Sequence, residues 1–164
     1  MMTKRIAFGW NGTLLPEVAE FRCDHPQGVQ ALLLSHSLRC GALGLMRSLQ
    51  RDGWEIWIYT LAEIPTRRVR LFFALNGVRL GGIITGQEHR SAVRAGRAPV
   101  ATLKHAPAFG LTLIADDKEA TAQAGRRYGF ETLMVTTCHK DWTALIRERC
   151  LATPQNKDSF AVAA

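Results

Sequence analysis

Short apolar runs alternate along the chain with segments whose apolar residues recur at helical spacing. The runs predict five strands, at residues 4–9, 54–60, 80–84, 111–115 and 131–136. The periodic segments predict helices at 36–52, from Pro65 to Asn76-Gly77, at 118–128 and at 141–150. Alternation of this kind is typical of βαβ units, so we predict a three-layer, Rossmann-like α/β fold with a central parallel sheet of about five strands.

The length of 164 residues suits a single domain, which we place at residues 1–150. Residues 16–35 are too few for a large cap domain and predict a small flap or loop insert. Residues 151–164 include a polar stretch and predict a flexible tail.

Three predicted strand ends carry positions of interest, namely Gly9, Thr60 and Asp116. Ligands of open α/β sheets bind beyond the carboxyl ends of the strands, where the connections diverge. We therefore expect these three positions, far apart in sequence, to converge on one site.

Four motifs occur in a characteristic order. They are the run from Ile6 to Leu14 (IAFGWNGTL), the strand from Trp54 to Thr60, the segment from Lys104 to Gly110, and the strand from Leu111 to Asp117 that ends in two aspartates. Over residues 4 to 137 the set resembles the haloacid dehalogenase-like (HAD) superfamily, whose first motif is an apolar strand followed by Asp-x-Asp-Gly-Thr. The resemblance implies a HAD-type fold.

In that family the first Asp is the nucleophile and the second is the general acid/base. Here the two positions are Gly9 and Asn11. The resemblance therefore implies a site in which no catalytic residue is intact, because glycine has no nucleophile and asparagine cannot carry a proton through the cycle. It favours a pseudoenzyme.

The resemblance also implies residues for binding. Thr60, Lys104 and Asn11 are the candidates for contact with a ligand or phosphate, and Asp116 and Asp117 are the candidates for weak Mg²⁺ binding. Simpler roles stay open: Thr60 as a strand end or helix-entry cap, Lys104 as a solvated residue, and the aspartates as an N-cap. We expect no required cofactor.

The formal net charge of +7 attracts phosphates and keeps nucleic acid open as a partner. If residues 89–97 are helical, Arg90, Arg94 and Arg97 would share one face and could rim the site; a solvated basic face is the alternative. Trp10 would either anchor a partner or pack the flap over the site.

Four scattered cysteines and the absence of a signal-peptide core favour a cytoplasmic protein with reduced thiols, and no apolar stretch is long enough to span a membrane. A zinc site from Cys23, His25, Cys138 and His139 is a weaker alternative, because the spacing matches no known ligand signature.

These observations favour a catalytically inactive HAD-like pseudophosphatase that binds a partner protein or a phosphorylated ligand. Two alternatives remain. One is a Mg²⁺-dependent HAD-like phosphatase or hydrolase with an atypical site. The other is a basic accessory protein that binds nucleic acid.

Overall fold

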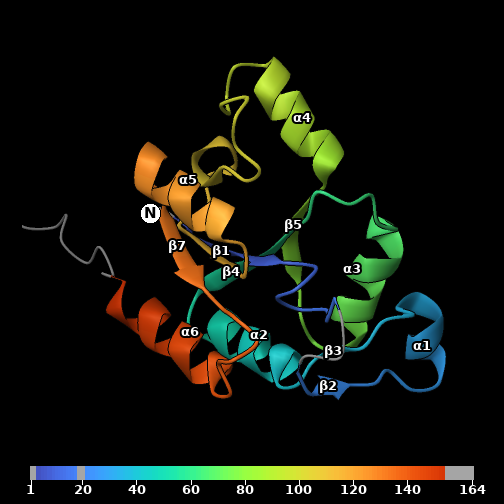
Figure 1. The fold of residues 1–164 in the computed structure, drawn as a ribbon. Coiled ribbons are helices and arrows are strands. Elements are labelled where there is room, and N and C mark those ends of the chain that lie inside the picture. Colours follow the sequence, from blue (N-terminus) through green and yellow to red (C-terminus); the bar gives the residue numbers. More distant parts are fainter. Residues whose placement is uncertain (1–2, 18–20, 154–164) are drawn as a thin grey trace, which may run out of the picture.

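The computed structural model describes residues 3–17 and 21–153, and its centre is a five-stranded parallel sheet (Figure 1). The strands are β1 (Lys4–Gly9), β4 (Trp54–Tyr59), β5 (Leu80–Ile84), β6 (Leu113–Asp116) and β7 (Glu131–Met134), in the spatial order β5-β4-β1-β6-β7. All neighbouring pairs in this sheet are parallel. The fold is therefore α/β and Rossmann-like, as predicted.

Helices cover both faces of this sheet. They are α2 (Ala42–Arg51), α3 (Thr66–Leu75), α4 (Gly86–Arg94), α5 (Glu119–Tyr128) and α6 (Trp142–Ala152), with a short 3₁₀ helix η1 (Ala106–Phe109). Figure 1 shows α2 and α6 on one side of the sheet and α5 on the other. The chain therefore forms three layers.

Each face of the sheet has its own apolar core. Ile6, Phe8 and Ile58 pack with buried side chains of α2, α3 and α6. Ala7, Tyr59 and Ile114 point the other way and pack with Ala106 of η1. Since successive strand residues face opposite sides, this alternation also sets the direction of Gly9 and Asp116, which follow the first core and so face the second.

The flap segment at 16–35 contains a short strand β2 (Cys23–Asp24) and a one-turn helix α1 (Val29–Leu33). Just after it, a second short strand β3 (Leu38–Arg39) pairs antiparallel with β2. The helix predicted over 36–52 is therefore wrong at its start. Leu38 is buried and pairs with Asp24, and Gly41 then adopts a left-handed φ of 83° before α2 begins. Helical spacing alone could not reveal this pairing with a distant strand.

The other element boundaries agree to within two residues of the prediction. The strand expected at 111–115 lies at 113–116, the strand expected at 131–136 ends at Met134, and the last helix continues to Ala152. Residues 151–152 of the predicted tail are thus helical, and 154–164 lie outside the described residues. Within residues 3–17 and 21–153, no helix has the length and apolar character that a membrane crossing requires.

Candidate functional site

The turn after β1 is closed by backbone hydrogen bonds. Leu14 N and Leu15 N both donate to Trp10 O, at 3.2 and 2.8 Å, and Gly12 has a left-handed φ of 81°. Asn11 lies exposed at the tip of this turn. The Asn-Gly pair is thus used for a tight loop at the carboxyl edge of the sheet.

Trp10 is buried and does not offer a surface for a partner. Its indole lies 6.5 Å, between ring centroids, from Phe73 of α3 and belongs to the larger apolar core. The alternative that Trp10 anchors a partner is therefore wrong, and the tryptophan packs the turn into the protein.

The space beside Gly9 is filled by a side chain from the neighbouring strand. Phe8 pairs with Ala115, so Gly9 and Asp116 lie next to each other on adjacent strands. A Cβ at position 9 would fall well inside van der Waals contact with Asp116 Oδ1, and 2.7 Å from Thr13 Oγ1. The carboxylate of Asp116 therefore occupies the space into which a side chain at position 9 would project.

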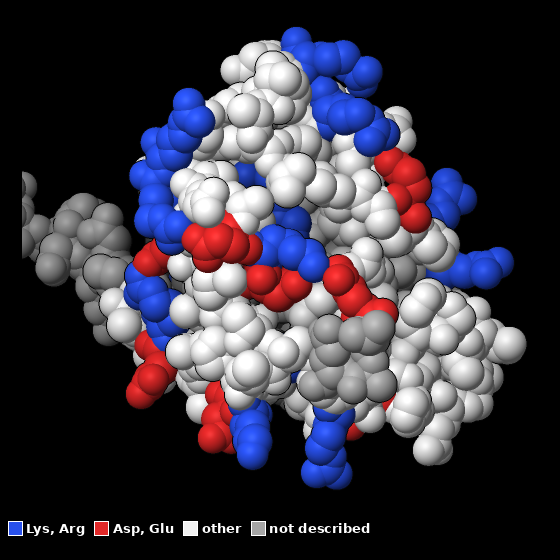
Figure 2. Space-filling view, in the orientation of Figure 1, with Lys and Arg blue, Asp and Glu red and all other residues white. Residues whose placement is uncertain are grey.

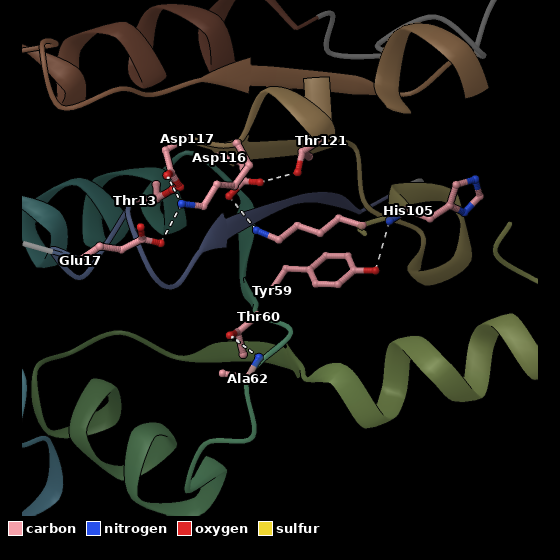
Figure 3. Close-up of polar contacts among 11 residues, drawn as sticks. Thr13, Glu17, Tyr59, Thr60, Ala62, His105, Asp116, Asp117 and Thr121 are labelled. Atoms are coloured by element: carbon pink, nitrogen blue, oxygen red, sulfur yellow. Dashed lines mark hydrogen bonds and ion pairs between the residues drawn. The ribbon is translucent and has the colours of Figure 1, made fainter. Parts of the chain in front are cut away.

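Both oxygens of Asp116 are bonded within the protein (Figure 3). Lys104 Nζ lies 2.6 Å from Oδ1, and the hydroxyl of Thr121 on α5 donates to Oδ2 at 2.5 Å. The exposed fractions of the Lys104 and Asp116 side chains are only 8% and 2%. The pair is thus a buried, charge-neutral unit.

A second carboxylate lies closer to solvent and is also paired. Thr13 Oγ1 donates to Asp117 Oδ1 at 2.9 Å, and Lys118 Nζ lies 3.0 Å from Asp117 Oδ2. The same ammonium lies 2.7 Å from Glu17 Oε1. The hydrogen bond to Glu17 is the main reason that the pKa of Lys118 is raised above its usual value, with Asp117 adding to it. This cluster links the loops after β1 and β6.

A buried aromatic and histidine network lies beneath the ion pair. The Tyr59 hydroxyl lies 2.7 Å from His89 Nδ1 and accepts a hydrogen bond of 3.1 Å from the backbone N–H of His105. His89 Nε2 lies 2.8 Å from Thr102 O. Because the carbonyl can only accept, Nε2 carries the proton and the Tyr59 hydroxyl donates to Nδ1. Lys104 Nζ lies 5.9 Å from the centroid of the Tyr59 ring, which joins this network to the ion pair.

Burial sets the protonation of this network. It lowers the pKa of both His89 and His105, and it raises the pKa of Tyr59. The neutral forms are therefore favoured at neutral pH. None of these three residues was singled out from the sequence, because a histidine on a helix and a tyrosine at a strand end carry no distinctive pattern.

Thr60 was predicted as the last residue of its strand and lies one residue beyond β4, where its hydroxyl has a local role. Thr60 Oγ1 accepts a hydrogen bond of 3.1 Å from Ala62 N, and Thr60 N donates to Ile84 O. Figure 3 shows this hydroxyl turned toward Ala62. The structure thus brings Gly9, Lys104 and Asp116 together, and it places Thr60 on the neighbouring strand end with its side chain capping the turn.

The arrangement of these carboxylates does not fit a bound Mg²⁺. A hard divalent cation needs free carboxylate oxygens, whereas each oxygen of Asp116 and Asp117 already has a partner, and two of the four face an ammonium. In residues 3–17 and 21–153, no group of three or more His, Cys, Asp or Glu side chains is placed to hold a metal ion. Binding of Mg²⁺ would require Lys104 or Lys118 to move away first.

The alternative zinc site is wrong, because its four residues do not form a metal cluster. His25 Nδ1 lies 2.5 Å from Ser37 Oγ, and His139 Nδ1 accepts a hydrogen bond from Thr136 N at 3.0 Å. Cys23 Sγ contacts Phe21 O, and Cys138 is exposed. These contacts hold local turns.

The basic segment after β5 is helical only as far as Arg94, so Arg97 does not share a helical face with Arg90 and Arg94. Arg90 pairs with Glu63 at 3.2 Å, Arg94 contacts Ser91, and Arg97 donates to Ala108 O. Figure 2 shows basic side chains over the region of α4, and acidic and basic side chains side by side near the centre of this face. The condition for an arginine rim, one helix that includes all three residues, is therefore not met, and the three arginines make separate local contacts.

No protein-family model matches the chain, and no curated protein matches it. Among solved structures, a chain in a structure described as the Pnkp1/Rnl/Hen1 complex is similar, with a TM-score of 0.51 and 11% identity. The similarity covers 82% of this chain and 46% of that one, so this chain spans less than half of its neighbour's length. At this identity the likeness concerns the fold alone, and it supports a Rossmann-like α/β architecture.

Proposed function

We propose that this chain is a catalytically inactive HAD-like pseudophosphatase that acts in the cytoplasm by binding. The proposal rests on the ordered motifs of the sequence and on one structural observation. That observation is the carboxylate of Asp116, which fills the space beside Gly9 and is bonded on both oxygens.

This observation bears on each part of the expected chemistry. A phosphatase of this family needs a carboxylate at position 9 to attack phosphorus, and glycine supplies none. Asp116 could not take that role easily, because its charge is neutralised by Lys104 and it is almost fully buried. Asn11 is exposed but cannot act as a general acid. Losing such a nucleophile typically reduces turnover by about 10⁴–10⁶-fold.

The binding role is assigned to the surface around the turn at Asn11, for a partner protein or a phosphorylated ligand. Asn11 is solvent-exposed, whereas Lys104 and Thr60 are buried. An anion would reach Lys104 only by replacing Asp116 as its partner. A free phosphate group should therefore bind weakly, unless other contacts of a larger ligand offset the loss of that ion pair.

The enzymatic part is tested by incubating the purified protein with Mg²⁺ and a broad panel of phosphate esters. We expect no turnover above background. Turnover that disappears in Asp116→Asn, with the fold checked by circular dichroism, would overturn the proposal in favour of an atypical Mg²⁺-dependent hydrolase. A variant with Gly9→Asp and Asn11→Asp supplies the comparison: activity that appears only there would mark these two positions as the lost chemistry.

The binding part is tested with inorganic phosphate and Mg²⁺, each titrated by calorimetry. We expect weak or undetectable binding of each to the wild type, and stronger Mg²⁺ binding to Lys104→Met because the competing ammonium is gone. Tight Mg²⁺ binding to the wild type that is unchanged in Lys104→Met would contradict this account of the site.

A further inference from the structure

Four arginines line an open groove at the edge of the sheet opposite Gly9 and Asp116. One hollow of about 700 Å³ is lined by Gly44, Arg47, Gln50, Arg51, Gly77 and Arg79. A second hollow of about 420 Å³ shares Gly77 and Arg79 with it and adds Arg70. We call the combined feature, defined by Arg47, Arg51, Arg70 and Arg79, the arginine groove. Arg51 ends α2 just before β4, and Arg79 precedes β5, so the groove lies at the amino-terminal edge of the sheet.

Backbone contacts hold the arginine groove in shape. Arg47 Nη1 donates to Asn76 O at 2.9 Å, and Arg70 Nη1 donates to Leu80 O at 3.1 Å. The amide of Gln50 bonds both backbone groups of Arg79, at 2.8 and 3.3 Å. Two guanidinium groups are thus each anchored through one nitrogen and keep their other N–H groups for a ligand.

The turn at Gly77 helps to form the arginine groove. Its φ is 73°, which disfavours other residues, and a Cβ there would lie 3.4 Å from Arg47 Cδ. The aliphatic part of Arg47 therefore lies against Gly77. The left-handed turn that ends α3 thus lies directly against an arginine of α2, which bonds the carbonyl of Asn76 in the same turn.

Among the described residues, no carboxylate lines the arginine groove or lies within 4 Å of its guanidinium groups in an ion pair. The residues that line both hollows include no Asp or Glu. Across residues 3–17 and 21–153, the ion pairs within 4 Å involve other cations, among them Arg5, Arg90, Lys104 and Lys118. All four groove arginines are exposed. Like charges that lie close together repel one another. An anion bound in the groove would reduce this repulsion among the arginines.

The chemistry of the arginine groove favours a chain of phosphates as the ligand. A planar guanidinium group can donate two hydrogen bonds to the oxygens of one phosphate. Several guanidinium groups in one groove can therefore contact several phosphates of a chain. The groove has no aromatic side chain in its lining, so it offers no platform for stacked bases. Contacts to the backbone alone would give binding that does not depend on base sequence.

We propose that the arginine groove binds the phosphate backbone of a nucleic acid. The site is separate from the one around Asp116, so this inference stands or falls independently of the proposed function. The sequence had indicated such a partner only through its net charge; the structure assigns particular residues to it.

The test is fluorescence anisotropy with a labelled oligothymidylate of about 20 nucleotides and a duplex of the same length, between about 50 and 200 mM salt. One variant combines Arg47→Gln, Arg51→Gln and Arg79→Gln. Its matched control combines Arg67→Gln, Arg68→Gln and Arg94→Gln, which removes the same charge from exposed positions outside the groove. Circular dichroism checks that both fold, and Arg51→Gln alone provides a milder second variant.

We expect the groove variant to bind at least about tenfold more weakly and the control no more than about threefold. The slope of log K against log salt should become shallower in the groove variant only, by about 2 for the single strand and about 3 for the duplex, as three phosphate contacts are lost. Arg51→Gln should show a smaller loss in the same direction.

Inorganic polyphosphate as a competitor distinguishes the two sources of a phosphate chain. Displacement of the oligonucleotide only at a large excess of polyphosphate supports nucleic acid, and preference for polyphosphate overturns that assignment. Equal losses in the two triple variants, or no binding to either oligonucleotide at low salt, would overturn the proposal.

Discussion

Lys104 and Asp116 form a buried ion pair whose Nζ and Oδ1 atoms lie 2.6 Å apart beside the glycine that ends β1. We expect Lys104→Met to destabilise the protein by about 3–5 kcal/mol, because Asp116 is left as an uncompensated buried charge. The double variant Lys104→Met with Asp116→Asn should lose less than Lys104→Met alone. Urea unfolding of the wild type, both single variants and the double variant measures this coupling.

The control for this cycle is Lys118→Met, whose side chain is 45% exposed. It should cost no more than about 1 kcal/mol, since exposed ion pairs contribute little. If the two single losses simply add in the double variant, Lys104 and Asp116 do not stabilise each other.

Gly9 leaves space that Asp116 now fills, so adding a methyl group there should be unfavourable. We expect Gly9→Ala to lower the free energy of unfolding by about 1–3 kcal/mol, as in other overpacked sites. In an Asp116→Ala background the same substitution should cost less than in the wild type, because the colliding carboxylate is gone and only the contact with the Thr13 hydroxyl, 2.7 Å from the added Cβ, remains.

Gly44 provides the matched glycine control. It lies within α2, and a Cβ there would meet no heavy atom within 4 Å. Gly44→Ala should therefore stabilise the protein by about 0.5–1 kcal/mol. A similar loss at positions 9 and 44 would argue against the crowding at Gly9.

The buried histidines make stability depend on mild acid. Burial lowers the pKa of His89 and His105 below the ordinary 6.5, so the unfolded chain binds more protons than the folded one. Their contribution to stability is full above pH 6.5 and is lost as the pH falls toward the lowered pKa values. The expected slope is up to about 1.4 kcal/mol per pH unit for each histidine.

Urea unfolding between about pH 7.5 and 5.5 measures this slope. His89→Gln should reduce it, whatever that variant does to stability at neutral pH. His36→Gln, at an exposed position, should leave it unchanged. An identical slope in the wild type and in His89→Gln would exclude His89 as its source.

The cysteines should differ widely in reactivity. Cys150 is buried, and burial raises its pKa to about 11, whereas Cys40 and Cys138 are exposed. A hydrogen bond with Asp24 raises the pKa of Cys40, so we expect iodoacetamide to modify Cys138 first, Cys40 next and Cys150 last. Peptide mass spectrometry over a time course gives the order, and early modification of Cys150 in native buffer would contradict its burial.

The parts of the fold that the sequence predicts well are those with local causes. Asn76-Gly77 stops α3 because Gly77 adopts the left-handed conformation, and the apolar run from Trp54 predicts β4. The start of α2 was mispredicted because Leu38 and Arg39 pair with a strand 14 to 16 positions earlier. Periodicity contains no information about that pairing.

The sequence predicted which residues belong to the candidate site better than it predicted the contacts between them. Strand order brings Asp116 beside Gly9, as the motif order implied, but the bond from Lys104 to Asp116 depends on the empty side-chain position at Gly9.

Arg39 is a clearer case of contacts that the sequence does not predict. It is buried, donates to Thr136 O and His139 O, and lies between the rings of Phe21 and Trp142. Only the packed fold brings these distant residues to one arginine.

The carboxylates of Asp116, the last residue of β6, and of Asp117, the next residue, differ in how strongly they are held by their partners. Lys118, whose side chain is 45% exposed, joins the exposed Glu17 to the more buried Asp117, so separating Lys118 from Glu17 costs little. Beneath them, Lys104 and Asp116 are almost fully buried, and parting them costs several times more. A molecule that approaches the turn at Asn11 would thus first meet the contacts of Lys118, which separate easily. Only a ligand that compensates a buried charge could separate Lys104 from Asp116.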